Sequence, residues 1–203
     1  PGANLEARAR SARRAALPPD ALLGHTMDDL AETVLLNLLR GAALDGLVGC
    51  DPQCRPLRGI RRVETHALCA GAGLAPVHDP SNLSPVHRRN RVRHELLPLL
   101  DEVAARDLVP VLARQADLLR DDALLLDELA AALDPTDAKA LAAAPPALAR
   151  RAIRRWLRHG AEQHPPDRAT VDRVLAVAGG ASAACDVGGG RSVRRHRGRL
   201  VLT

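Results

Sequence analysis

The stretch Gly24–Thr33, which reads GHTMDDLAET, decides the fold and directly follows the short apolar run Ala21–Leu23. Two prolines precede this run and Gly24 ends it, a pattern that predicts a short buried strand over residues 21–24. The apolar spacing that follows predicts a helix over residues 27–39. A strand that leads straight into a helix is typical of α/β folds, so we expect this part of the chain to be α/β.

The acids at this strand-to-helix turn allow two interpretations. Asp28 and Glu32 are four residues apart and share a helix face, as do Asp29 and Thr33. Open α/β sheets bind ligands at the ends of their strands, where neighbouring carboxylates can hold the Mg²⁺ that accompanies a nucleotide. Acids at a helix N-terminus are also favoured by capping and by the helix dipole, and Thr26 with Asp29 forms a capping box. The spacing alone leaves both interpretations open.

The rest of the chain is predicted to be mainly helical. Apolar periodicity predicts helices over residues 4–17, 64–72, about 86–100, 107–133, 146–158 and 167–178. Residues 79–82 are predicted to form a turn, and the glycines at 188–190 lead into a terminal hairpin. Its strands are expected at 192–197 and 199–203, with the turn at Gly198. Without a following helix, these glycines are not a phosphate-binding loop.

Arginine carries almost all of the positive charge. The chain has 203 residues and a formal net charge of +5, and of its 29 basic residues only Lys139 is a lysine. Guanidinium groups suit bidentate contact with phosphate. Basic blocks at residues 55–100 and 138–173 alternate with an acidic block at 101–137, which predicts a polarised surface able to meet a polyanion. Trp156 is the one aromatic residue, so the chain has no row of rings on which bases could stack.

Three groups of arginines are candidate anion-binding sites. Arg89 and Arg93 share a helix face without an internal partner and would repel each other unless an anion lies between them. The second and third groups suit contact with an RNA backbone. They are Arg150, Arg154 and Arg158 on one predicted helix, and Arg194, Arg195, Arg197 and Arg199 on the hairpin. Each of the three groups could also be a solvated basic surface.

Two ordered motifs carry a family resemblance. Gly24–Thr33, continuing to Leu39-Arg40-Gly41, resembles the G-H-x-x-D-D-x-A-E-T segment of the tRNA(Ile)-lysidine synthetases, which belong to the PP-loop ATP pyrophosphatase superfamily. A second set follows the same family in order and spacing: Arg55-Pro56-Leu57, Arg62-x-Glu64, Asp79-x-Ser81-Asn82 and Arg89–Pro98. The resemblance covers about residues 20–100. It departs at Leu30, Ser84 and His87, where the family often has Gln, Asp and an aromatic residue.

The resemblance implies a domain organisation. Residues 1–100 would be the C-terminal part of a Rossmann-like PP-loop nucleotide-binding domain, and residues 101–203 a mainly α-helical, tRNA-binding substrate domain with a terminal hairpin. Members of the family also carry a Ser-Gly-Gly-x-Asp-Ser phosphate loop upstream, which residues 1–20 do not resemble. We therefore expect that the chain begins within the domain and is inactive alone.

The resemblance also implies a reaction and a set of site residues. The reaction is the ATP-dependent ligation of L-lysine to the wobble cytidine of an isoleucine tRNA with a CAU anticodon, with ATP and Mg²⁺ as cofactors. The expected setting is cytoplasmic, without a membrane, and a homodimer is expected. The resemblance assigns Asp28, Asp29 and Glu32 to catalysis, with Asp28 and Asp29 on the metal; His25, Arg89 and Arg93 to the nucleotide; and Arg40, Asn82 and Asn90 to substrate or tRNA. Arg150, Arg154 and Arg158 lie outside the resemblance and are expected to contact tRNA because of their spacing on one helix face.

Two other functions stay open. The basic stripes would also suit a non-catalytic tRNA-binding module. A tRNA-thiolating PP-loop enzyme is the other alternative, but such enzymes use paired cysteines for a cluster. Here Cys50 and Cys54 have three residues between them and no second pair follows, so packing roles are favoured. Four cysteines without a secretory leader also indicate a reducing compartment rather than a disulfide framework.

Overall fold

The computed structural model describes residues 12, 15–18, 20–49, 52–77, 79–158 and 166–203. Contacts divide the chain into two compact units, Pro1–Arg120 and Asp121–Thr203. The boundary expected between residues 100 and 101 stays a prediction. The helix expected at 4–17 falls largely on residues outside the described ranges. No helix in the described residues is long and apolar enough to cross a membrane.

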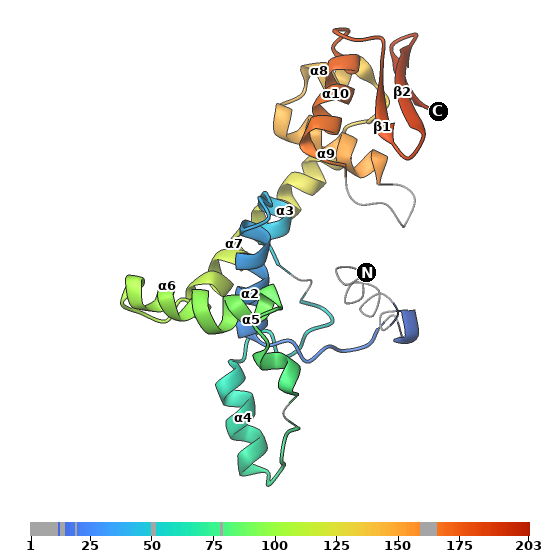
Figure 1. Ribbon diagram of the computed structural model, residues 1–203. Coiled ribbons are helices and arrows are strands. Elements are labelled where there is room, and N and C mark those ends of the chain that lie inside the picture. Colours follow the sequence, from blue (N-terminus) through green and yellow to red (C-terminus); the bar gives the residue numbers. More distant parts are fainter. Residues whose placement is uncertain (1–11, 13–14, 19, 50–51, 78, 159–165) are drawn as a thin grey trace. The chain divides into compact units, whose positions relative to one another are not determined.

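The first unit is helical in its described part (Figure 1). Its core lies where α2 meets the segments that follow α5, and where it meets the first turns of α7. Ala31 and Leu35 pack with Val92 and Leu97, whereas Leu30 and Val34 pack against the small residues Ala113 and Ala116. The elements are α2 (Met27–Leu38), α3 (Leu44–Leu47), α4 (Arg62–Gly71), η1 (Pro80–Leu83), α5 (Arg88–Arg91), η2 (Val92–Leu96), α6 (Leu97–Ala104) and α7 (Val109–Ala131), which continues beyond Arg120.

The strand expected at residues 21–24 is not present. The segment is extended, but its one backbone hydrogen bond to another segment of the described chain runs from Leu23 N–H to the carbonyl oxygen of Cys54, at 2.8 Å. Leu22 is 69% exposed, so the run is not a buried strand either. A strand requires a paired neighbour along its length, and apolar character alone does not supply one.

The single helix expected from about residue 86 to 100 is divided into three elements. The middle one, η2, is a π-helix, and Pro98 lies in the first turn of α6 directly after it. Proline has no N–H to donate to the carbonyl four residues earlier. The π turn directly precedes this proline, and Arg89 and Arg93, from α5 and η2, both donate to Glu32 of α2.

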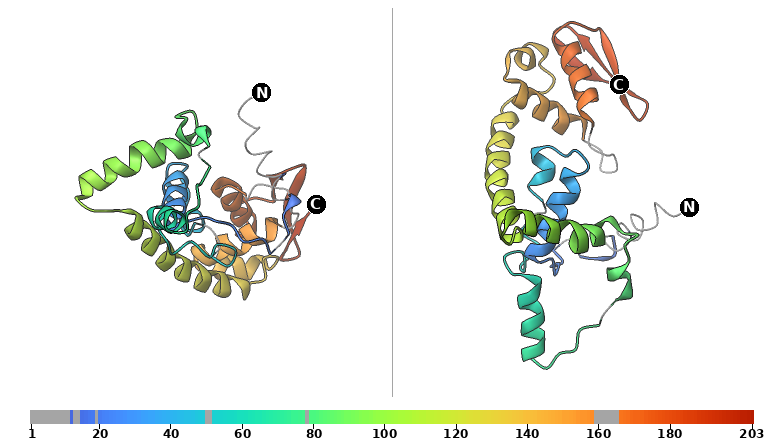
Figure 2. Two further views of the ribbon diagram at one scale, coloured as in Figure 1. Left: turned by 90° about the horizontal axis from the view of Figure 1, so that it is seen from below. Right: turned by 60° about the vertical axis from the view of Figure 1, so that its left-hand side comes forward.

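The second unit packs a small sheet against helices α9 and α10. Figure 2 shows its strands beside α10. Val193 and Leu200 from the sheet are buried with Val174 of α10 and Ile153 of α9. The sheet has the order β1-β2-β3 and is antiparallel. The elements are α8 (Ala138–Ala143), α9 (Pro146–Leu157), α10 (Arg168–Ala178), β1 (Ala184–Gly188), β2 (Arg191–His196) and β3 (Arg199–Leu202).

The predicted terminal hairpin is confirmed and gains a third strand. Arg197 and Gly198 join β2 to β3 with φ of 47° and 79°, and two positive φ values are what a two-residue turn of type I′ requires. Gly189 and Gly190, with φ of 64° and 73°, likewise join β1 to β2. The glycine run is thus a turn, as its lack of a following helix indicated. Strand β1 and the short helices α3 and α8 were not predicted.

Candidate active site at the start of α2

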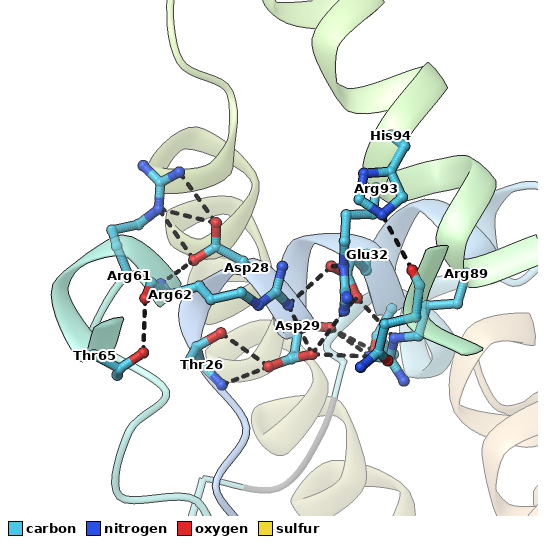
Figure 3. Close-up of polar contacts among 12 residues, drawn as sticks. Thr26, Asp28, Asp29, Glu32, Arg61, Arg62, Thr65, Arg89, Arg93 and His94 are labelled. Atoms are coloured by element: carbon cyan, nitrogen blue, oxygen red, sulfur yellow. Dashed lines mark hydrogen bonds and ion pairs between the residues drawn. The ribbon is translucent and has the colours of Figure 1, made fainter. Parts of the chain in front are cut away.

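Three carboxylates lie at the start of α2, and arginines from two other segments surround them (Figure 3). Asp28 and Asp29 are in the first turn of the helix, and Glu32 is one turn further on. Arg61 and Arg62 come from the start of α4, whereas Arg89 and Arg93 come from α5 and η2. These contacts join positions that are 30 to 61 residues apart in the sequence.

Glu32 is the centre of the arrangement. Its side chain is 0% exposed, and three guanidinium groups contact its carboxylate. Arg93 donates from Nε at 2.7 Å and from Nη2 at 3.1 Å, one bond to each oxygen. Arg89 donates from Nε at 2.8 Å, and Arg62 from Nη2 at 3.0 Å. Burial penalises the charged form of Arg93, but its bonds to Glu32 outweigh this and raise its pKa above the usual value of an arginine.

Asp29 joins the helix cap to the arginines. One carboxylate oxygen accepts from the backbone N–H and the hydroxyl of Thr26, both at 2.9 Å, so the predicted capping box is confirmed. The other oxygen accepts from Nη2 of Arg62 at 3.1 Å. Burial acts to raise the pKa of Asp29, but the Thr26 backbone bond and the charge of Arg62 lower it below 3.8 overall.

Asp28 forms a separate pair with Arg61. The guanidinium of Arg61 spans both carboxylate oxygens at 3.2–3.3 Å, and the backbone N–H of Arg62 donates to Asp28 at 2.7 Å. Arg61 also contacts Asp107, just before α7. Burial acts to raise the pKa of Asp28, but these hydrogen bonds lower it below 3.8 overall. Asp28 therefore links the starts of α2 and α4 and is not a free carboxylate.

The carboxylates do not fit a resident metal centre. In the part of the chain that the structure describes, no group of three or more His, Cys, Asp or Glu side chains could hold a metal ion. The oxygens of Asp28 and Asp29 instead accept bonds from arginines and from the backbone. The Mg²⁺ roles expected for these two residues stay predictions, and any Mg²⁺ would have to arrive with the phosphates of a nucleotide.

The remaining residues expected near the nucleotide lie in different settings. His25 lines a cavity of about 10 Å³ with Thr26 and Asp29, far smaller than a nucleotide site. Asn90 is buried, and its amide nitrogen donates to the carbonyl oxygens of Ser81 and Ser84, both at 2.8 Å. This amide holds the turn around η1 in place. Asn82, in that turn, is exposed.

Arg40 lines a groove of about 460 Å³. Apolar side chains from α2 and the residue after it, from η2 and from α6 line the same groove, as do Arg88 and Arg91. Arg91 is held there by a two-pronged bond to Glu95, as the four-residue spacing predicted. The apolar residues are Leu36, Leu39, Val92, Leu96 and Leu99.

The expected tRNA-facing arginines of the second unit are not equivalent. Arg150 pairs with Asp172 at 2.8 Å, whereas Arg158 follows the last turn of α9 and is exposed. Arg154 is partly buried. On the hairpin, Arg199 contacts Asp134 and Arg195 donates to the carbonyl oxygen of Ala178 at 3.0 Å. Arg194 and Arg197 are exposed.

Sequence reasoning did not assign Arg61 and Arg62, which prove central to the site. The signal that could have found them is the motif Arg62-x-Glu64, because Glu64 caps α4 by accepting from the backbone N–H of Arg61 at 2.7 Å. This cap fixes the backbone from which both arginines extend toward α2. Cys54, Cys69 and Cys185 are free thiols, and Cys50 lies outside the described residues.

Comparisons with known proteins agree with both units. A family model described as a PP-loop domain matches residues 1–100, and one described as the TilS substrate binding domain matches residues 137–201. The tRNA(Ile)-lysidine synthase of Nocardia farcinica is 43% identical over 98% of this chain and 69% of its own length. The enzyme of the same name from Rhodococcus erythropolis is 42% identical over 99% of this chain and 69% of its own length. The one from Mycobacterium tuberculosis is 41% identical over 97% of this chain and 69% of its own length.

Proposed function

Because the chain belongs to the tRNA(Ile)-lysidine synthase family, we propose that it serves the ATP-dependent formation of lysidine on an isoleucine tRNA. The observation that carries this proposal is that the residues matched to the PP-loop domain gather three arginines beside α2, a charge arrangement suited to phosphate. The relatives are tRNA(Ile)-lysidine synthases, which disfavours the tRNA-thiolating alternative.

The proposed reaction has two steps. The oxygen on the second ring carbon of the wobble cytosine attacks the α-phosphorus of ATP, and pyrophosphate leaves. The ε-amine of L-lysine then attacks that ring carbon, AMP leaves with the oxygen, and a proton is lost from the amine. Negative charge builds up on phosphate oxygens in the first step, so fixed guanidinium groups would stabilise its transition state.

In this proposal the arginines face the phosphates. Arg89 and Arg93 keep the nucleotide role that the resemblance implies, and Arg62 joins them because it shares Glu32 and Asp29 with them. ATP would enter as its magnesium complex, with the metal held mainly by the phosphates. Asp28 and Asp29 are proposed to face the magnesium complex or the lysine ammonium group when the substrates displace their arginine partners.

The second unit and the groove are proposed to hold the tRNA. Arg150, Arg154 and Arg158 lie in the part matched to the substrate binding domain. Arg40, with Arg88 and Arg91, offers cationic groups in a groove of the first unit that apolar side chains also line. Asn82 and Asn90 are proposed to act on the substrate through the turn that Asn90 stabilises. A cytoplasmic setting and a homodimer stay predictions.

The function can be tested with a chimera. The 203 residues contain no Ser-Gly-Gly-x-Asp-Ser sequence, so a segment with the phosphate loop that the family resemblance implies would be joined to Pro1. We expect the chimera to incorporate labelled lysine into an isoleucine tRNA with a CAU anticodon, and not into one with a different wobble base. Asp29→Asn should abolish incorporation while tRNA affinity changes only a few-fold. Lack of incorporation by a folded chimera that binds ATP would refute the proposal.

A further inference from the structure

Glu32 has no remaining capacity for a substrate or a metal. Its carboxylate is fully buried and accepts four bonds, two on each oxygen, from Arg62, Arg89 and Arg93. A carboxylate has about four acceptor positions, so these bonds saturate it. A buried carboxylate is costly unless it is fully paired, and here the pairing is complete. The group is therefore built to hold arginines and not to exchange ligands.

The three arginines would not stay together without Glu32. Arg89 and Arg93 are one helical turn apart and carry like charges, which repel at that spacing. Arg62 comes from α4 and brings a third positive charge to the same place. Arg89 is fixed further by the backbone oxygen of Asp29 at 3.0 Å and by the hydroxyl of Thr33 at 3.1 Å. The orientations of the three guanidinium groups are therefore set by the buried Glu32 carboxylate and its neighbours.

The arrangement leaves donors and charge for a second anion. Among the contacts of the described residues, none uses the Nη1 atom of Arg62, Arg89 or Arg93. Within this set, the three guanidinium groups carry one charge more than the two carboxylates that they contact, Glu32 and Asp29, while the neighbouring Arg61 is shared by Asp28 and Asp107. The three arginine side chains are 22–26% exposed, which leaves them partly accessible to a ligand.

We propose that Glu32 is a positioning residue, which gathers Arg62, Arg89 and Arg93 into a site for a pyrophosphate-class anion and contacts neither metal nor lysine. This inference rests on the proposed function in that the reaction there releases pyrophosphate. It replaces the catalytic role that the resemblance implies for Glu32, and it adds Arg62 as a phosphate-binding residue. Asp28 and Arg61 form their own pair and lie outside this site.

Glu32→Gln tests the role by the sign of its effect. Pyrophosphate alone would be titrated into the chain and into the variant by calorimetry at fixed ionic strength. Removing a negative charge should strengthen anion binding if Glu32 only opposes the anion. If Glu32 positions the arginines, the pyrophosphate affinity of Glu32→Gln should fall by about tenfold or more. The side-chain NH₂ of glutamine donates hydrogen bonds and cannot accept one from a guanidinium group, so it displaces that arginine. Affinity that is equal or higher in the folded variant overturns the proposal, as does a wild-type chain that binds no pyrophosphate.

Two further variants keep the test decisive. Glu95→Gln breaks the exposed two-pronged bond to Arg91 in the same helical segment, and it should leave pyrophosphate affinity within about twofold. If Glu32→Gln does not fold, Arg62→Ala removes one arginine while Glu32 keeps its three bonds to Arg89 and Arg93. Pyrophosphate affinity should again fall by about tenfold. Unchanged affinity in Arg62→Ala overturns the proposal.

Binding of the other two ligands separates this inference from the proposed function. If Glu32 were a ligand of Mg²⁺ or of the lysine ammonium group, a folded Glu32→Gln variant of the chimera would lose affinity for MgCl₂ or L-lysine alone, and that result overturns the positioning role. If pyrophosphate binding responds as expected but the wild-type chimera makes no lysidine, the proposed function fails and the positioning role stands.

Discussion

At the scale of the residue, the start of α2 depends on carboxylates that stay ionised. The pKa values of Asp28 and Asp29 lie below the usual 3.8, because hydrogen bonds and arginine charges outweigh the effect of burial. A carboxylate with a lowered folded-state pKa adds stability that is fully present above its unfolded pKa. This stability is lost as the pH falls through the folded pKa, so its loss occurs below about pH 4.

The double variant Asp28→Asn/Asp29→Asn tests this linkage. At pH 6 its free energy of unfolding should be lower than that of the wild type by roughly 1–3 kcal/mol, since charge-assisted bonds to Arg61 and Arg62 are lost. The difference should shrink as the pH is lowered from 4 to 2.5, because the wild-type carboxylates become protonated there. Urea unfolding followed by circular dichroism at several pH values measures it. A difference that is the same at pH 6 and at pH 2.5 would contradict the assignment.

At the scale of the element, α9 presents arginines whose availability differs. Arg150 is already paired with Asp172, and Arg168 contacts the same carboxylate at 3.3 Å. The three-residue change Arg150→Ala/Arg154→Ala/Arg158→Ala should weaken tRNA binding and lower the slope of log affinity against log salt by up to roughly two units. Because Arg158 is exposed, Arg158→Ala alone should account for a larger share of this decrease in slope than Arg150→Ala.

The controls for α9 come from the same unit. Arg168→Ala removes an exposed arginine of α10 that also contacts Asp172, and it should change the salt slope by less than Arg158→Ala. Tm should change little in Arg158→Ala and Arg168→Ala, because substitutions of exposed charged residues alter stability by about 0.5 kcal/mol or less. Filter binding from 50 to 300 mM KCl measures the slopes. If the triple variant keeps the wild-type slope, α9 is not a tRNA contact and the hairpin arginines become the candidate.

Local patterns predicted the elements well, and they failed where pairing over long distances decides the structure. Helix α2 and its capping box, the long helix α7 and the terminal hairpin follow from periodicity, capping and turn residues that act within a few positions. The segment 21–24 has the apolar character of a strand, but it can form one only if a neighbouring segment pairs with it along its length. The pairing of Arg62 and Arg93 with Glu32 likewise spans 30 and 61 residues, and no local rule gives it.

At the scale of the whole molecule, the two units carry different parts of the proposed reaction. The PP-loop match ends at residue 100, and the substrate binding match begins at residue 137. Each unit has its own core: two buried clusters that share α2 in the first unit, and one cluster that includes α9 and α10 in the second. The arginine site on Glu32 lies in the first unit and the α9 stripe in the second. Pyrophosphate binding and tRNA binding can thus be disrupted by separate substitutions.

Residues 1–203 as a polypeptide are expected to bind a phosphate anion without reacting with ATP. These residues hold guanidinium groups for phosphate but no Ser-Gly-Gly-x-Asp-Ser sequence, whose backbone N–H groups would surround the phosphates of ATP. Arginines alone can bind the product anion but do not place the α-phosphorus for attack. The purified polypeptide with ATP, Mg²⁺, tRNA and lysine should therefore release no pyrophosphate above background, whereas the chimera should release it. Release by residues 1–203 that Arg89→Ala abolishes would show that the arginine site is sufficient for catalysis and that the phosphate loop is dispensable.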